Sequence, residues 1–151
     1  MMKLSRTLPG LLSALCMCAP AFATLGGSAA SVEADRATLK GVARVTPLVD
    51  YSVHEIQTPA GTVVREYVSA QGQVFAVSWN GPALPDLAQL LGGYATTLQQ
   101  AASHPHYNHH RLSIDTPDVV MHSSGHARIR YGSAWVPALL PQNFSPKDIG
   151  Q

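Results

Sequence analysis

The chain has 151 residues, and its 10 basic and 9 acidic side chains leave a formal net charge of +1. This balance, without a basic stripe or a polybasic run, argues against partners such as nucleic acid or anionic lipid. The length suits one domain with its own hydrophobic core, and no stretch after residue 23 is apolar for long enough to span a membrane.

The N-terminus predicts a secretory signal peptide over residues 1–23. Lys3 and Arg6 form a basic region, an apolar run follows, and Ala21-Phe22-Ala23 supplies the small residues of a cleavage site. The apolar run is too short to cross a bilayer as a helix. We therefore expect cleavage after Ala23 and export to the periplasm or the medium.

Both cysteines of the chain, Cys16 and Cys18, lie inside this predicted signal peptide. A lipid anchor needs a small residue before the cysteine, but Leu15 and Met17 occupy those positions. We expect no lipid anchor and a cysteine-free mature chain. Such a chain has no disulfide, no thiol nucleophile and no thiolate metal ligand.

Residues 24–48 begin with TLGGSAAS and predict a flexible lead-in. A short helix over 31–40, with Ser31 as its N-cap, is the one element expected there. We place a single α+β domain at residues 49–144 and a C-terminal tail at 145–151.

Three segments rich in β-branched and aromatic residues follow, at 51–57, 62–69 and 73–80. The loops between them end in Gly61 and Gly72, as expected for three-residue hairpin loops with glycine in the left-handed region. The pattern predicts a three-stranded antiparallel meander.

The first loop sets a trial register for this meander. Pairing Thr58 with Thr62 places Glu55 opposite Arg65 and His54 opposite Glu66. A slip by one residue would bring Glu55 against Glu66, and two like charges in cross-strand contact are destabilising. Charge and hydrophobic pattern therefore favour the same register.

The second loop places Tyr67 opposite Phe75 in the same way. The aromatic side chains then share a face, which we expect to be the core beneath a helix rather than a ligand pocket. That face is predicted to carry Tyr51, Val53, Val63, Tyr67, Phe75, Val77 and Trp79.

A helix is predicted from Asp86 to about Ser103. Asp86 suits the N-cap, Gln89 stands at the capping-box position, and leucines and a tyrosine follow at helical spacing. Gly92-Gly93 falls inside this helix at a cost of about 1 kcal/mol per glycine relative to alanine. We expect a close approach of the helix to the sheet to offset that cost.

Further strands are predicted at 111–115, 118–122 and 126–131, and the last two are expected to form a hairpin around Ser123-Ser124-Gly125. The predicted fold class is therefore α+β. An antiparallel sheet is built from the three-stranded meander and, after the helix, the hairpin, and the helix packs on one face of the sheet.

Four histidines stand close together before the strand at 111–115. Their H-x-H-x-x-H-H spacing can bind zinc or copper through imidazole, but the stretch offers no carboxylate and no regular structure to orient ligands. We expect a polar loop and no cofactor. The alternative is a periplasmic metal-binding protein, and His122 and His126, expected to face each other in the hairpin, could join the site. The candidate ligands are His104, His106, His109, His110, His122 and His126.

Candidate recognition and catalytic residues are fewer. His54, Arg65 and Glu66 mark a candidate recognition surface on the sheet, although such cross-strand pairs usually serve register. A small hydrolase with His54 or His126 as the base is a second alternative, but the sequence contains no G-x-S-x-G elbow.

Two stretches resemble a known family, YSVHEIQTPAGTVVREYVSAQGQVFAVSWNGPALPDLAQLLGGY (51–94) and SGHARIRYGSAWVPALLP (124–141). The family consists of exported proteobacterial proteins catalogued as a domain of unknown function, and the resemblance runs from the TLGG stretch to about Phe144. The resemblance implies export and a single domain, and it supplies no catalytic residues. The expected function is a non-catalytic binding or accessory protein of the cell envelope, with an envelope protein or a small ligand as its unidentified partner.

Overall fold

The computed structural model describes residues 25–102 and 111–150. The predicted signal peptide and the histidines between residues 104 and 110 lie outside these ranges. In the part of the chain that is described, no helix is long and apolar enough to cross a membrane.

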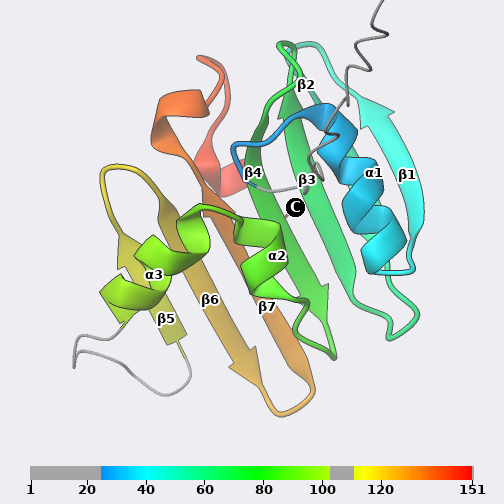
Figure 1. The fold of residues 1–151 in the computed structure, drawn as a ribbon, viewed down its shortest axis with the longest axis vertical. Helices are drawn as coiled ribbons and strands as arrows, with labels where there is room; N and C mark the ends of the chain where they lie inside the picture. The colour runs from blue at the N-terminus through cyan, green and yellow to red at the C-terminus, as the bar shows by residue number, and fades with distance from the viewer. Residues whose placement is uncertain (1–24, 103–110, 151) are drawn as a thin grey trace, which may run out of the picture.

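A seven-stranded antiparallel sheet forms the centre of the protein, with the strand order β1-β2-β3-β4-β7-β6-β5 (Figure 1). Every neighbouring pair of strands is antiparallel. The strands are β1 (Val42–Pro47), β2 (Tyr51–Gln57), β3 (Val63–Ser69), β4 (Val74–Gly81), β5 (Arg111–Asp115), β6 (Val120–His126) and β7 (Ile129–Trp135).

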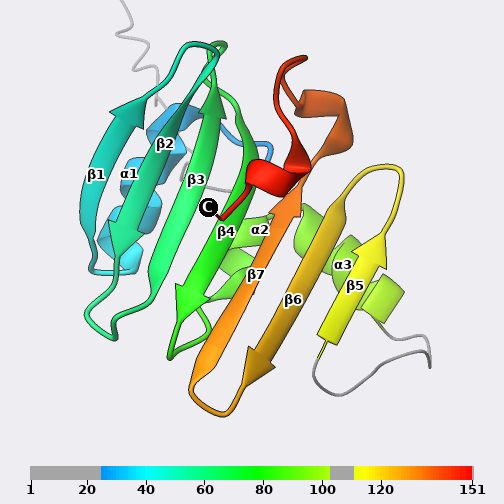
Figure 2. The same cartoon turned by 180° about the vertical axis from the view of Figure 1, so that it is seen from behind.

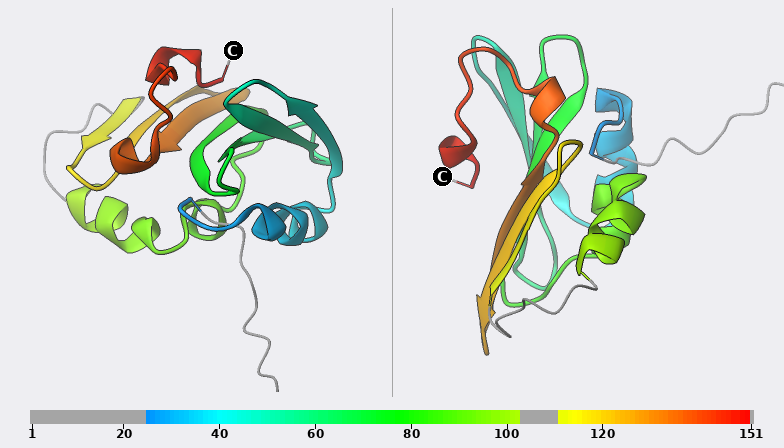
Figure 3. Two further views of the ribbon diagram at one scale, coloured as in Figure 1. Left: turned by 90° about the horizontal axis from the view of Figure 1, so that it is seen from above. Right: turned by 90° about the vertical axis from the view of Figure 1, so that its left-hand side faces the viewer.

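The helices α1 (Ala29–Thr38), α2 (Leu87–Leu91) and α3 (Tyr94–Ala102) cover one face of this sheet, as the edge-on views in Figure 3 show. The C-terminal segment, with the short 3-10 helices η1 (Pro137–Leu139) and η2 (Pro146–Asp148), crosses the opposite face (Figure 2). The α+β class is confirmed. The arrangement differs from the prediction because the sheet has seven strands rather than a meander and a hairpin.

Each face of the sheet buries its own hydrophobic cluster. The larger cluster lies beneath the helices and includes Ile56, Val64, Val77, Trp79 and Leu98. The smaller one lies beneath the C-terminal segment. It consists of Tyr67, Phe75, Ala76 and Phe144, with Tyr51, Val53, Trp135, Leu139, Leu140 and Ile149 packed around it.

The predicted register of the first hairpin is confirmed. Glu55 pairs with Arg65 and His54 with Glu66, and the Thr58 amide donates to the Thr62 carbonyl at 2.9 Å to close the loop. The register could be predicted from the local sequence because the loop and the charges select the same pairing.

The register predicted for the second hairpin holds only next to its loop. Val68 pairs with Val74 as expected, but Tyr67 pairs with Ala76, because a β-bulge leaves Phe75 as an extra residue in β4. An extra residue reverses the alternation of side chains along the rest of a strand. The bulge therefore sends Trp79 to the helix-covered face, whereas Phe75 joins the cluster on the opposite face. The single aromatic face predicted from the sequence is wrong for this reason.

The segment predicted as a flexible lead-in belongs to the folded domain. Leu25 is 3% exposed, and the amide of Gly26 donates to the Val74 carbonyl at 2.8 Å. Helix α1 and strand β1 follow directly. The domain therefore includes the described residues before 49, because burial of Leu25 and main-chain bonds to β4 anchor them.

The single helix predicted after Asp86 is two helices. The Asp86 side chain does cap α2, accepting from the Gln89 amide at 3.2 Å, but Gly92 has φ +49° and ends this helix. A Cβ added to Gly93 would meet nothing within 4 Å, so no close approach to the sheet explains that glycine. The glycine pair serves as a helix break.

The predicted hairpin of the last two strands is present as β6 and β7, but its loop is not at Ser123-Ser124-Gly125. These residues continue β6, and their backbones are paired with β7, while Ser123 and Ser124 also pair with β5. The turn lies at residues 127–128, between His126 and its partner Ile129. A turn at Gly125 would forfeit main-chain hydrogen bonds to the neighbouring strands, and this cost outweighs the local preference of Ser-Ser-Gly for a loop.

Candidate functional site

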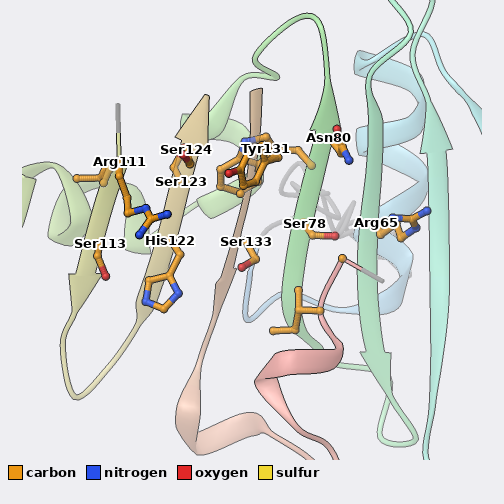
Figure 4. A pocket seen from close by; sticks show the side chains of 15 residues that line it. Arg65, Ser78, Asn80, Arg111, Ser113, His122, Ser123, Ser124, Tyr131 and Ser133 are labelled. Atoms are coloured by element: carbon orange, nitrogen blue, oxygen red, sulfur yellow. The ribbon is translucent and has the colours of Figure 1, made fainter. Parts of the chain in front are cut away.

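The open half of the sheet face opposite the helices carries a groove of about 460 Å³. It extends from β3 across β4, β7 and β6 to β5, and Figure 4 shows its polar side chains standing on these five strands. The polar lining consists of Arg65, Ser78, Asn80, Arg111, Ser113, His122, Ser123, Ser124, Tyr131 and Ser133.

The C-terminal segment forms one wall of this groove. Ile149 and Gly150 line it, and the Gly150 amide donates to the Tyr67 hydroxyl at 2.7 Å. Within the predicted tail, Ile149 and Gly150 are thus held against the sheet, and Ile149 also packs against the aromatic cluster.

Strand β7 approaches Trp79 closely beside the groove. A Cβ at Gly132 would lie 2.4 Å from the Trp79 ring and 2.6 Å from the His122 carbonyl oxygen. Both contacts are far shorter than van der Waals separation, so only glycine fits at this position. The Trp79 ring packs on the helix-covered side of the sheet, and both residues also contribute to the lining of the groove.

An ion pair and a histidine–carboxylate contact border the groove. At the β3 end, Arg65 Nε donates to Glu55 Oε2 at 2.8 Å. At the β5–β6 end, His122 Nε2 lies 3.6 Å from Asp115 Oδ1, and the His122 ring packs edge-on against Trp135 with ring centroids 5.1 Å apart. Both contacts are partly exposed, so each contributes at most about 1 kcal/mol to stability.

A second polar cluster lies on the other side of the sheet, beneath α1. Asp35 and Glu66 are each 1% exposed, and the Gln89 side chain donates to Asp35 Oδ1. The two carboxyl groups interact directly, and burial is the main reason that the pKa of Glu66 is raised to about 9 and that of Asp35 to about 6. With a proton on Glu66, its hydroxyl can donate to Asp35, so the pair shares one negative charge at neutral pH.

The structure separates the three residues of the predicted recognition surface. Arg65 lines the groove, whereas Glu66 points to the opposite face and is fully buried under α1. His54 stands opposite Glu66, and burial lowers its pKa. Arg65 is the one of the three that belongs to the groove.

The structure also separates His122 and His126. They lie four residues apart on the same strand, or about 13 Å at the usual rise per residue, so they cannot share a metal ion. Within residues 25–102 and 111–150, no group of three or more His, Cys, Asp or Glu side chains could hold a metal. The hypothesis for His104, His106, His109 and His110 concerns residues outside these ranges.

For a hydrolase, the relevant geometry is a serine beside a histidine. Ser52 Oγ lies 3.1 Å from His54 Nε2, but neither residue lines the groove. In the groove, Ser113 and Ser133 flank His122 across the strands, and in the described structure neither hydroxyl hydrogen-bonds to its ring. The groove therefore presents side chains suited to binding rather than an assembled nucleophile and base.

Sequence reasoning missed the groove because it assembles from distant segments. Three of its serines lie on three separate strands, each between two non-polar neighbours; they are Ser78, Ser113 and Ser133. Each strand alone therefore looks like an ordinary half-exposed strand. Alternation of serine with apolar residues was the available signal. The strand order 4-7-6-5, which brings the serines together, cannot be read from that alternation.

Fold and groove together define an α+β domain with one helix-covered sheet face and one face that is partly open and polar. The chain belongs to the family described as "Protein of unknown function (DUF2844)", whose model matches residues 21–149. No curated protein and no solved structure matches the chain.

Proposed function

We propose that this protein is exported and acts as a non-catalytic binding protein of the cell envelope, and that its ligand occupies the groove on the open sheet face. The observation that carries the proposal is the groove itself. It is a hollow of about 460 Å³ lined by hydroxyl, amide, guanidinium and imidazole groups, in the size range of small-molecule sites. The signal-peptide pattern of residues 1–23 supports export.

The sheet supports a binding role because it is a rigid platform. The strands beneath the groove are paired on both sides, except for the edge strand β5, and the C-terminal segment is bonded to Tyr67. Side chains on such strands are held close to one geometry, so little conformational entropy is lost when a ligand binds.

The test is an NMR screen of the purified protein against sugars, carboxylic acids and short peptides. We expect at least one class to shift the amide signals of Ser78 and Ser133 saturably. A Ser133→Leu variant, which fills the groove, should lose this response, whereas Ser52→Ala on the opposite face should retain it. Shifts confined to other surfaces would overturn the proposal.

A further inference from the structure

The two ends of the groove are marked by arginines. Arg65 stands on β3 and Arg111 on β5, as Figure 4 shows, with β4, β7 and β6 between them. Four strand spacings separate them, or about 19 Å across a flat sheet. A guanidinium group binds a carboxylate through two parallel hydrogen bonds, so each end is suited to an acidic group.

The lining of the groove is positively charged. None of its residues is acidic, although Asp115 lies beside it, 3.6 Å from His122. Glu55 offsets part of the charge of Arg65, but in the described structure no carboxylate forms a salt bridge with Arg111. The field inside the groove therefore favours an anionic ligand.

Between the arginines the groove presents hydroxyl and amide groups. Ser78, Ser133 and Ser113 can each donate and accept, and Asn80 adds an amide. Tyr131 is 42% exposed and offers a flat apolar ring with a polar tip. Such a surface matches a ligand that carries many hydroxyl groups on rings, with acidic groups spaced along its length.

We propose that the groove binds an acidic oligosaccharide, a chain of sugar rings bearing carboxylates. This inference rests on the proposed function and names the ligand class of the same groove. A peptide fits less well over the middle of the groove, because a common way to bind an extended peptide is to add it as a strand to a free sheet edge. Here β4, β7 and β6 use their main-chain groups to pair with strands on both sides, so across these three strands a ligand meets side chains, and in the described part of the chain β5 alone of the groove's strands has a free edge.

The experiment is a calorimetric and NMR titration of the purified protein with three probes of equal length. They are hexagalacturonate, the neutral sugar maltohexaose and the acidic peptide hexaglutamate. We expect saturable binding of hexagalacturonate at the groove, weakened by added salt, and binding of the other two at least tenfold weaker.

Substitutions of single arginines test which positive charge contributes to hexagalacturonate binding. Arg111→Ala should weaken hexagalacturonate binding about tenfold, which corresponds to the loss of about one charge-assisted hydrogen-bonded contact. Arg111→Lys should restore part of the affinity. The matched control is Arg44→Ala, since Arg44 is exposed on β1, away from the groove. Circular dichroism of each variant confirms that it is folded.

The outcomes separate the ligand class from the proposed function. Equal or tighter binding of maltohexaose or hexaglutamate at the groove overturns the acidic oligosaccharide and leaves a binding groove in place. Equal losses in Arg44→Ala and Arg111→Ala indicate unspecific charge attraction and also overturn it. If no probe shifts the groove signals, the ligand class is wrong, and the wider NMR screen decides whether the groove binds anything.

Discussion

Glu66 provides the sharpest test of the physical reasoning, because a buried carboxyl group couples folding to pH. Burial beneath α1, and then the charge of Asp35, raise the pKa of Glu66 from its ordinary 4.5 to about 9. The folded state therefore retains a proton that the unfolded chain releases. The contribution of this group to stability is fully present below about pH 4.5 and is lost progressively as the pH rises toward 9.

The size of the effect follows from this shift. Each pH unit between the unfolded and folded pKa values lowers the free energy of unfolding by about 1.4 kcal/mol. At pH 7 the loss amounts to about 3 kcal/mol, a large part of the stability of a domain of this size. Above about pH 7 the slope is that of Glu66, because the pKa of Asp35 is raised only to about 6, and His54, whose pKa burial lowers from 6.5, is by then largely neutral in both states.

Glu66→Gln removes the titrating group and keeps a donor for Asp35. We expect this variant to be about 1–3 kcal/mol more stable than the wild type at pH 7 and nearly independent of pH between 7 and 9. The assay is urea unfolding at pH 5, 6, 7, 8 and 9 with linear extrapolation. Glu55→Gln, which changes a partly exposed carboxylate of β2, is the matched control and should keep the wild-type slope.

A wild-type protein whose stability does not fall between pH 7 and 8 would refute the reasoning without any variant. So would a Glu66→Gln protein that retains the wild-type slope. If Glu66→Gln is less stable than the wild type only at pH 5, the difference reports how well glutamine packs. At that pH the protonation of the Glu66 carboxyl group lowers the free energy of unfolding very little.

Three further predictions concern packing, export and metal binding. Gly132→Ala should destabilise the protein by about 1–3 kcal/mol in urea unfolding, because its Cβ would overlap the Trp79 ring, whereas Gly93→Ala, with open space around it, should not. Expression in an exporting host should yield a mature chain that begins after Ala23, and an unprocessed N-terminus in intact-mass spectrometry would contradict the signal peptide. Calorimetric titration with zinc and copper should show weak binding at most. Tight one-to-one binding that is lost when the four histidines are changed to alanine would instead establish a metal protein; they are His104, His106, His109 and His110.

Much of the local structure could be predicted because short-range chemistry decides it. The loops ending in Gly61 and Gly72 close as expected, with positive φ at both glycines, and Asp86 caps the helix that follows it. The register of β2 against β3 also follows from neighbouring residues, since a slip would place like charges together. In each case the residues that decide the outcome lie within a few positions or across one tight turn.

The path of β6 shows where such reasoning ends. Ser123-Ser124-Gly125 favours a loop locally, yet the segment stays extended because its main chain is paired with β5 and β7. Likewise, Gly92-Gly93 interrupts a sequence with helical spacing, and the backbone of Gly92 ends α2. Whether such a segment forms a loop or a strand, or one helix or two, depends on contacts with residues far away in the sequence.

The sequence by itself determined the fold class, the first hairpin and the cap of α2, because each depends on contacts between near neighbours. Only the tertiary structure decided the bulge at Phe75, which reverses the faces of β4, and the strand order that brings Arg65 and Arg111 to one groove. Both are outcomes of packing a whole sheet between two layers. No local sequence pattern encodes how the whole sheet packs, and the candidate groove exists because of that packing.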